Sequence, residues 1–95
     1  MRKYEIMYII APNLDETQTK ETIERYNNVL NDNGAEVTVV DEMGKRRLAY
    51  EIEGFREGFY VRLEVNAEPK AIDEFNRLTK INENIIRTLV VREDE

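Results

Sequence analysis

The side chains best suited to act together in this chain are three consecutive cations, Lys45, Arg46 and Arg47. They open a run of strand-forming residues, 44–52, in a chain that is otherwise acidic. A β-strand sends Lys45 and Arg47 to one face and Arg46 to the other, at a spacing fixed by the sheet. Such a cluster suits phosphate groups or an acidic protein surface. The alternative is a solvated edge strand whose cations discourage edge-to-edge pairing.

The residues of nucleophilic catalysis are missing from the sequence. It contains no Ser, His, Cys or Trp, which excludes Ser-His-Asp and Cys-His sites, Cys/His zinc sites and His- or Cys-ligated haem. Neighbouring carboxylates, such as Glu51 and Glu53 or Asp73 and Glu74, could do acid–base work. No other polar residues converge with them in a recognisable pattern. We therefore predict no enzyme, no catalytic residue, no metal and no cofactor.

The composition is that of a folded, highly soluble domain. Of the 95 residues, 41% are hydrophobic and 36% charged, which argues against a disordered chain. We expect one domain over residues 1–95, with 93–95 as a short, solvated and unstructured acidic tail. No apolar run approaches the ~20 residues of a membrane span. An acid stands where a signal peptide is apolar, and the lack of cysteine fits a reducing cytoplasm.

The net charge of −6 opposes unaided binding of nucleic acid. Neutralisation of phosphates supplies most of the non-specific affinity for RNA or DNA, and an acidic chain cannot provide it as a whole. Binding to RNA would therefore depend on a local cationic patch or on a basic partner.

The first half of the chain reads as a strand followed by a helix. Residues 3–10 alternate with period two and are apolar on both faces, which indicates a central strand. Asp15 followed by Gln18 resembles a capping box, and Gly34 is typical of a helix end. The buried stripe of this helix is predicted to be Ile23, Tyr26 and Leu30.

The next two segments indicate strands whose apolar positions change parity. In residues 35–43 the apolar side chains Val37 and Val39 are odd-numbered, whereas those in residues 46–53 are even-numbered. A strand cannot change faces without an extra residue. We therefore predict a bulge or kink near residues 43–44.

The second half repeats the strand and helix pattern. Gly54 and Gly58 bracket a predicted turn, and residues 59–66 form a third strand. Pro69 suits the first turn of a second helix, and residues 85–92 form a fourth strand. The stripe of the second helix is predicted to be Ile72, Phe75 and Leu78, and one face of the fourth strand is assigned Ile86, Thr88 and Val90.

The order βαββαβ is the ferredoxin-like split βαβ motif, an α+β fold. Right-handed crossovers place strands one and three in the centre of a four-stranded antiparallel sheet, with both helices on one face. The other face stays open, and an apolar patch ringed by guanidinium groups indicates a binding surface. Its expected members are Met7, Ile9, Tyr60, Leu89 and Val91, with Arg47, Arg62 and Arg87.

Other modules share this architecture. Residues 58–61 resemble part of the RNA-recognition-motif signature, but Leu63 stands where the pattern needs an aromatic and Phe59 should point to the core. An ordinary strand is the better interpretation. A small-molecule regulatory domain would need a ligand-binding loop after the first strand, and residues 11–14 contain no glycine there. An enzyme of the same architecture would need anion-binding and catalytic polar residues in that loop, where Asn13 stands alone.

The chain resembles the bacterial small-subunit ribosomal protein six family over essentially its whole length. The most specific stretch is residues 44–52, Gly-Lys-Arg-Arg-Leu-Ala-Tyr-Glu-Ile. The other matching segments are Met1-Arg2-Lys3-Tyr4-Glu5, Pro12-Asn13-Leu14, Asn33-Gly34-Ala35, Gly58-Phe59-Tyr60 and Ile85-Ile86-Arg87.

The resemblance implies a structural role in the small ribosomal subunit, in the cytoplasm. It also implies binding to the central domain of small-subunit rRNA together with small-subunit ribosomal protein eighteen, as a heterodimer. By that likeness, and from charge and strand geometry, the expected partner-facing residues are Lys45, Arg46, Arg47, Leu48 and Tyr50. The expected RNA contacts are Arg2, Lys3, Arg47, Arg87 and Arg92.

Overall fold

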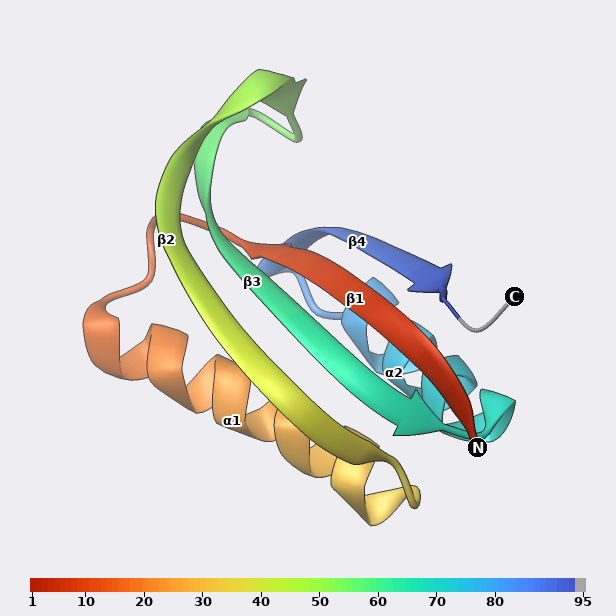
Figure 1. The fold of residues 1–95 in the computed structure, drawn as a ribbon. Helices are drawn as coiled ribbons and strands as arrows, with labels where there is room; N and C mark the ends of the chain where they lie inside the picture. The colour runs from red at the N-terminus through yellow and green to blue at the C-terminus, as the bar shows by residue number, and fades with distance from the viewer. Residues whose placement is uncertain (94–95) are drawn as a thin grey trace.

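The computed structural model describes residues 1–93 and has the predicted order βαββαβ. The strands form one antiparallel sheet in the order β2-β3-β1-β4, so β2 and β4 are its edges. Both helices lie on the same side of this sheet (Figure 1). The ferredoxin-like fold is therefore confirmed. The elements are β1 (Arg2–Ile10), α1 (Glu16–Asp32), β2 (Glu36–Ile52), β3 (Phe55–Ala67), α2 (Pro69–Lys80) and β4 (Ile85–Arg92).

Both helices begin where their capping residues predict. The Asp15 side chain accepts the Gln18 N–H at 2.7 Å, and the Asp15 N–H donates to Gln18 Oε1 at 3.2 Å, which completes the capping box of α1. Gly34 follows the last turn with φ of 87°, a left-handed conformation that favours glycine. Pro69 occupies the first turn of α2, where its missing N–H leaves no partner unsatisfied.

The main hydrophobic core lies between the sheet and the helices. Its centre is a trio of rings, Tyr8, Tyr26 and Phe75, packed edge to face with centroids 5.7 to 6.0 Å apart. Such offset geometries add to the stabilisation that burial alone provides. The stripe residues Ile23 and Leu30 of α1 are buried here as predicted.

A second, smaller cluster lies on the helix-free side, under the end of the β2–β3 hairpin. Ile9 of β1, Leu48 of β2 and Ile86 of β4 are buried in it together with Ala11. The hairpin extends beyond the rest of the sheet and curls there (Figure 1). Gly58 allows this approach, because a Cβ at that position would overlap Cγ2 of Ile9.

The predicted bulge near residues 43–44 is present, but β2 contains three irregularities, and the first two together return Arg47 to the side of Val37. One register shift falls between Glu42 and Gly44, where the bulge was expected, and Gly44 has φ of 89°. Another falls between Val37 and Val39, so Val39 pairs with a residue of the open face and does not share the face of Val37. The third follows Arg47. Each inserts residues into β2 that β3 does not match.

The predicted turn between Gly54 and Gly58 was wrong. The chain turns at Glu53 and Gly54, which both have positive φ (48° and 86°), and Ile52 pairs directly with Phe55. Positive φ at both central residues is the two-residue hairpin turn that matches strand twist. Gly58 lies inside β3 instead, where its small size is needed for packing.

The face assigned to Ile86 was also wrong. A register shift between Ile9 and Ile10 leaves Ile86 as an extra residue in β4, since Ile10 pairs with Ile85 and Ile9 with Arg87. Ile85 therefore joins the main core and Ile86 the smaller cluster. Of the expected acidic tail, the exposed Glu93 donates its N–H to the Lys3 carbonyl at 2.8 Å, and residues 94–95 lie outside the described residues.

Candidate functional site

The centre of the helix-free face is charged, and carboxylates surround the arginine there, Arg62. Arg62 of β3 donates to Glu5 of β1 at 2.6 Å and also to Glu64 of β3. The hydrogen bonds that Arg62 donates to Glu5 and Glu64 raise the pKa of its guanidinium above the ordinary value. Asp41 of β2 pairs opposite Arg62 and so shares its face. Arg62 was expected to be an available cation of this face, and the structure instead surrounds it with acids.

An apolar stripe runs beside this charged centre toward β4. Met7 pairs with Leu89 and Glu5 with Val91, so all four side chains project from the open face. Leu89 is 60% exposed and Val91 44% exposed. The expected mixture of apolar and cationic groups on one uncovered face is therefore present, although Ile9 is buried rather than exposed.

The hairpin end brings an exposed ring next to a cation of β4. The Arg87 guanidinium lies 5.8 Å from the centroid of the Tyr50 ring, and it donates to the Tyr50 hydroxyl at 3.2 Å. Tyr50 is 61% exposed. The two residues are 37 positions apart in the sequence, and this contact joins Tyr50 of the partner-facing set to Arg87 of the RNA-contact set.

The three cations of β2 divide between the two sides, as alternation predicted. Arg46 pairs with Gly58, whose missing Cβ faces Ile9, so Arg46 takes the open side. Lys45 lies on the helix side, where it borders a hollow with Lys20 of α1. Arg47 pairs with Glu57 and so shares the side of Lys45, which corrects its expected place on the open face.

Leu48, expected to face a partner, is only 6% exposed and is packed in the smaller cluster. Its side chain positions the hairpin over the open face and leaves little surface for a contact. Arg47, Tyr50 and Arg56 border a hollow together with Leu48, and all three are polar. The accessible part of the hairpin is therefore its rim rather than its apolar centre.

The remaining RNA-contact candidates lie at the opposite end of β1. Arg2 and Lys3 begin that strand, and Arg92 pairs with Tyr4 beside them. By register, Arg2 and Arg92 project to the helix side and Lys3 to the open side. The structure thus brings Arg2, Lys3 and Arg92 together but leaves Arg87 five residues away along β4, next to Tyr50.

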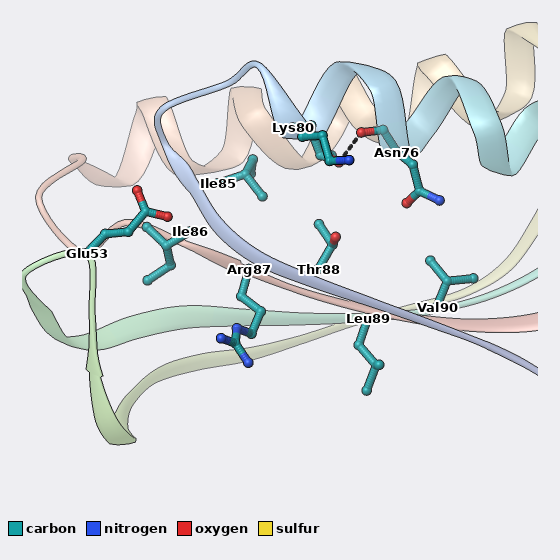
Figure 2. A pocket seen from close by; sticks show the side chains of 10 residues that line it. Glu53, Asn76, Lys80, Ile85, Ile86, Arg87, Thr88, Leu89 and Val90 are labelled. Carbon is teal, nitrogen blue, oxygen red and sulfur yellow. Dashed lines mark hydrogen bonds between the residues drawn. The ribbon is translucent and has the colours of Figure 1, made fainter.

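Sequence reasoning missed a groove along β4, of about 530 Å³. Figure 2 shows Asn76 and Lys80 of α2 on one side of β4, and Arg87 and Leu89 on the other side. Lys80 was not singled out because only the return of β4 beside α2 brings it close to Arg87. Glu53 of the hairpin turn is the acidic residue of the lining.

Within residues 1–93, no group of three or more His, Cys, Asp or Glu side chains could hold a metal ion. None of the helices in this part of the chain is long and apolar enough to cross a membrane.

Comparison with known proteins decides the family. A family model described as ribosomal protein S6 matches residues 3–92. The chain belongs to this family. It is 66% identical to the small ribosomal subunit protein bS6 of Shouchella clausii and 65% identical to that of Halalkalibacterium halodurans, over 95 residues that cover all of both chains in each case.

Ribosomal protein S6 structures have the same fold. The crystal structure of 30S ribosomal protein S6 from Thermotoga maritima has a TM-score of 0.93 and 31% identity, with 97% of this chain and 87% of that chain covered. The resemblance stated from residues 44–52 is therefore confirmed. Membership makes the chain a ribosomal protein of the small subunit and not an enzyme, with the cytoplasmic ribosome as its location.

Proposed function

We propose that this member of the ribosomal protein S6 family is an adaptor. It binds the central domain of small-subunit rRNA as a heterodimer with small-subunit ribosomal protein eighteen. The observation that supports this proposal best is the uncovered sheet face, where exposed Leu89 and Val91 adjoin a centre rich in carboxylates. A basic partner suits that face, because its cations complement the acids and its apolar groups cover the stripe.

The partner contact includes the rim of the hairpin. Arg46 and Tyr50 are exposed on it, Arg47 projects to its other side, and Lys45 lies beside α1. Leu48 contributes indirectly by fixing the hairpin over Ile9. A partner that grips this rim would reach both sides of the edge strand, as the alternating cations predict.

RNA contacts lie at the two cationic ends of the sheet. Arg2, Lys3 and Arg92 form one end. Arg87 and Arg47 lie toward the other, on either side of Tyr50. Between them the carboxylates around Arg62 repel phosphate. The chain alone therefore binds RNA weakly, and a basic partner over the acidic centre would join the two ends into one RNA surface.

The test is the affinity for a transcript of the rRNA central domain, measured with and without purified ribosomal protein eighteen. Affinity is expected to rise steeply with the partner and to fall between about 50 and 200 mM salt as counterions are released. Equal affinity with and without the partner would contradict the adaptor mechanism.

A matched pair of variants locates the RNA contact. Replacing Arg2 and Lys3 by Gln should reduce the salt slope by about one for each phosphate contact that is lost. Lys20→Gln on the exposed part of α1 removes the same kind of charge elsewhere and should leave the slope unchanged. An equal reduction by Lys20→Gln would show that only the total charge matters.

A further inference from the structure

The two edges of the sheet differ in how well they are shielded from another strand. The β2 edge carries three register shifts and a run of charged residues that includes Lys45, Arg46 and Arg47. Bulges and charges are the usual means of preventing edge-to-edge pairing. This edge is therefore poorly suited to accept an added strand.

The outer edge of β4 has neither protection over most of its length. Residues 87–92 pair with β1 without interruption, and the four central positions, 88–91, carry no charge. Within residues 1–93 no strand pairs with the outer edge of β4. Every second residue of this stretch therefore directs its N–H and its C=O away from the sheet.

The side chains beside this edge are both apolar and cationic. Leu89 is exposed on the open side, whereas Asn76 and Lys80 of α2 stand on the helix side (Figure 2). Lys80 forms no ion pair with any residue of the described part of the chain. Arg87 contacts the neutral Tyr50 hydroxyl and ring. It forms no ion pair with another residue of the range 1–93.

We propose that the outer edge of β4 is a strand-addition site for an extended segment of another polypeptide. The segment would pair its main chain with residues 87–92, place apolar side chains against Leu89, and set a carboxylate near Lys80. The proposal concerns the main chain at the outer edge of β4 and requires neither the RNA contact nor the partner contact proposed above, but it shares Leu89 with the face assigned to the partner.

The chemistry of the edge favours a polypeptide over RNA or a second copy. Half of the outward groups of an edge strand are carbonyl oxygens, which repel phosphates but accept peptide N–H groups. RNA would also leave Leu89 without an apolar contact. A second copy paired over residues 87–92 would offer Lys80 no carboxylate from that strand, because the stretch contains no acidic residue.

The experiment uses the full chain and a synthetic eight-residue peptide in which valine alternates with threonine and glutamate. NMR should show shifts and slowed exchange confined to the amides of residues 87–92 and their neighbours. The same peptide N-methylated at alternate backbone nitrogens should bind at least about tenfold more weakly, since it loses several main-chain hydrogen bonds. Replacing its glutamates by lysines should weaken binding about threefold.

Matched variants of the two edges locate the site. Leu89→Asp, at an exposed position that tolerates a polar residue, should weaken peptide binding about tenfold by removing an apolar contact and adding like charge. Val39→Asp on the β2 edge, where Val39 is 37% exposed, should leave it unchanged. Circular dichroism confirms that both variants fold.

Three results would overturn the proposal. The first is equal binding of the N-methylated peptide, which would show that main-chain pairing is not involved. The second is a concentration-dependent dimer of the chain alone that Leu89→Asp abolishes, which would assign the edge to a second copy. The third is no binding of the peptide, with loss of rRNA affinity in Leu89→Asp measured without ribosomal protein eighteen, which would assign the edge to RNA.

Discussion

The sheet separates two hydrophobic clusters of very different size. On the helix side of residues 1–93, sixteen buried residues form a core around Tyr8, Tyr26 and Phe75. On the other side, four buried residues lie under the hairpin. The larger cluster links both helices to the three strands β1, β3 and β4, whereas the smaller one holds down the end of a single hairpin. The exposed Arg46 and Tyr50 belong to the hairpin that the small cluster holds, so the proposed partner contact lies apart from the main core.

The largest expected effect is a cavity in the main core. Phe75→Ala should lower the free energy of unfolding by about 3–5 kcal/mol, because Phe75 is fully buried against Tyr8 and Tyr26. Unfolding in urea, followed by circular dichroism, measures this value. The comparison is Leu48→Ala in the small cluster, which should cost about 2 kcal/mol, the low end for a buried leucine.

Hydrogen exchange further distinguishes Leu48→Ala from Phe75→Ala. Leu48→Ala should speed exchange in the hairpin, residues 45–57, more than in α1 or α2. A uniform acceleration, or a cost equal to that of Phe75→Ala, would show that the two clusters unfold as one unit.

The next effect tests the close approach of the hairpin. Gly58→Ala should lower the free energy of unfolding by about 1–3 kcal/mol, because the added methyl overlaps Cγ2 of Ile9 and lies 3.3 Å from the Ile10 carbonyl oxygen. Denaturant unfolding measures it. In the double variant Ile9→Ala with Gly58→Ala the overlap is gone, so the two costs should not add. Strict additivity would mean that the glycine is needed for another reason.

A smaller effect concerns the Tyr8 hydroxyl, which is buried and has no hydrogen-bond partner among the described residues. Tyr8→Phe should stabilise the fold by about 1 kcal/mol at pH 7, since an unsatisfied polar group is removed. Burial, with smaller contributions from Tyr26 and Glu42, raises the pKa of Tyr8 far above the ordinary tyrosine value.

Because the pKa of Tyr8 is raised, the difference in stability between the wild type and Tyr8→Phe depends on pH. The folded chain keeps Tyr8 neutral, whereas the unfolded chain ionises it near pH 10. The wild type therefore loses stability as pH rises above about 10, and Tyr8→Phe lacks this contribution. Unfolding curves at pH 9 and above should show a gap that widens with pH, and a constant gap would contradict the assignment.

The smallest expected effect on stability is at the rim of the hairpin. Replacing Arg46 and Arg47 by Ala should change the free energy of unfolding by no more than about 0.5 kcal/mol, since both side chains are exposed. Docking of ribosomal protein eighteen, measured by calorimetry, should weaken clearly. A large loss of thermal stability with docking intact would reverse the proposed division between the two sides of the sheet.

The fold could be predicted because its signals are local. Asp15, Gln18 and Gly34 marked the ends of α1, Pro69 marked the start of α2, and the periods of two and 3.6 gave the element order. Right-handed crossovers then left one arrangement of the strands. These features depend on residues close in sequence, so a single chain contains them.

The hairpin could be predicted only in part. The change of parity required one irregularity near Gly44, but three occur, and bulges at Val39 and after Arg47 left no mark in the pattern. The turn was displaced because Glu53 is not a typical residue at positive φ, whereas Gly58 is a typical turn residue. Only the approach of Ile9 from β1 explains why Gly58 lies in a strand.

The spatial arrangement of the candidate site residues could be predicted only in part. The contact of Tyr50 with Arg87 depends on how far the hairpin curls, and the burial of Leu48 depends on the same curvature. Lys80 was missed because its position beside β4 is set by the path of the chain between α2 and β4. Positions that depend on long-range register could not be read from alternation alone.

The bonding of Arg62 has a consequence for how this surface could be altered. Because Glu5 and Glu64 share one guanidinium, the three residues together leave one negative charge in the middle of the sheet. Exchanging both acids for their amides would turn this triplet into a positive one without changing its size. Under the adaptor mechanism proposed above, this exchange would let the chain approach a polyanion with less help from its partner.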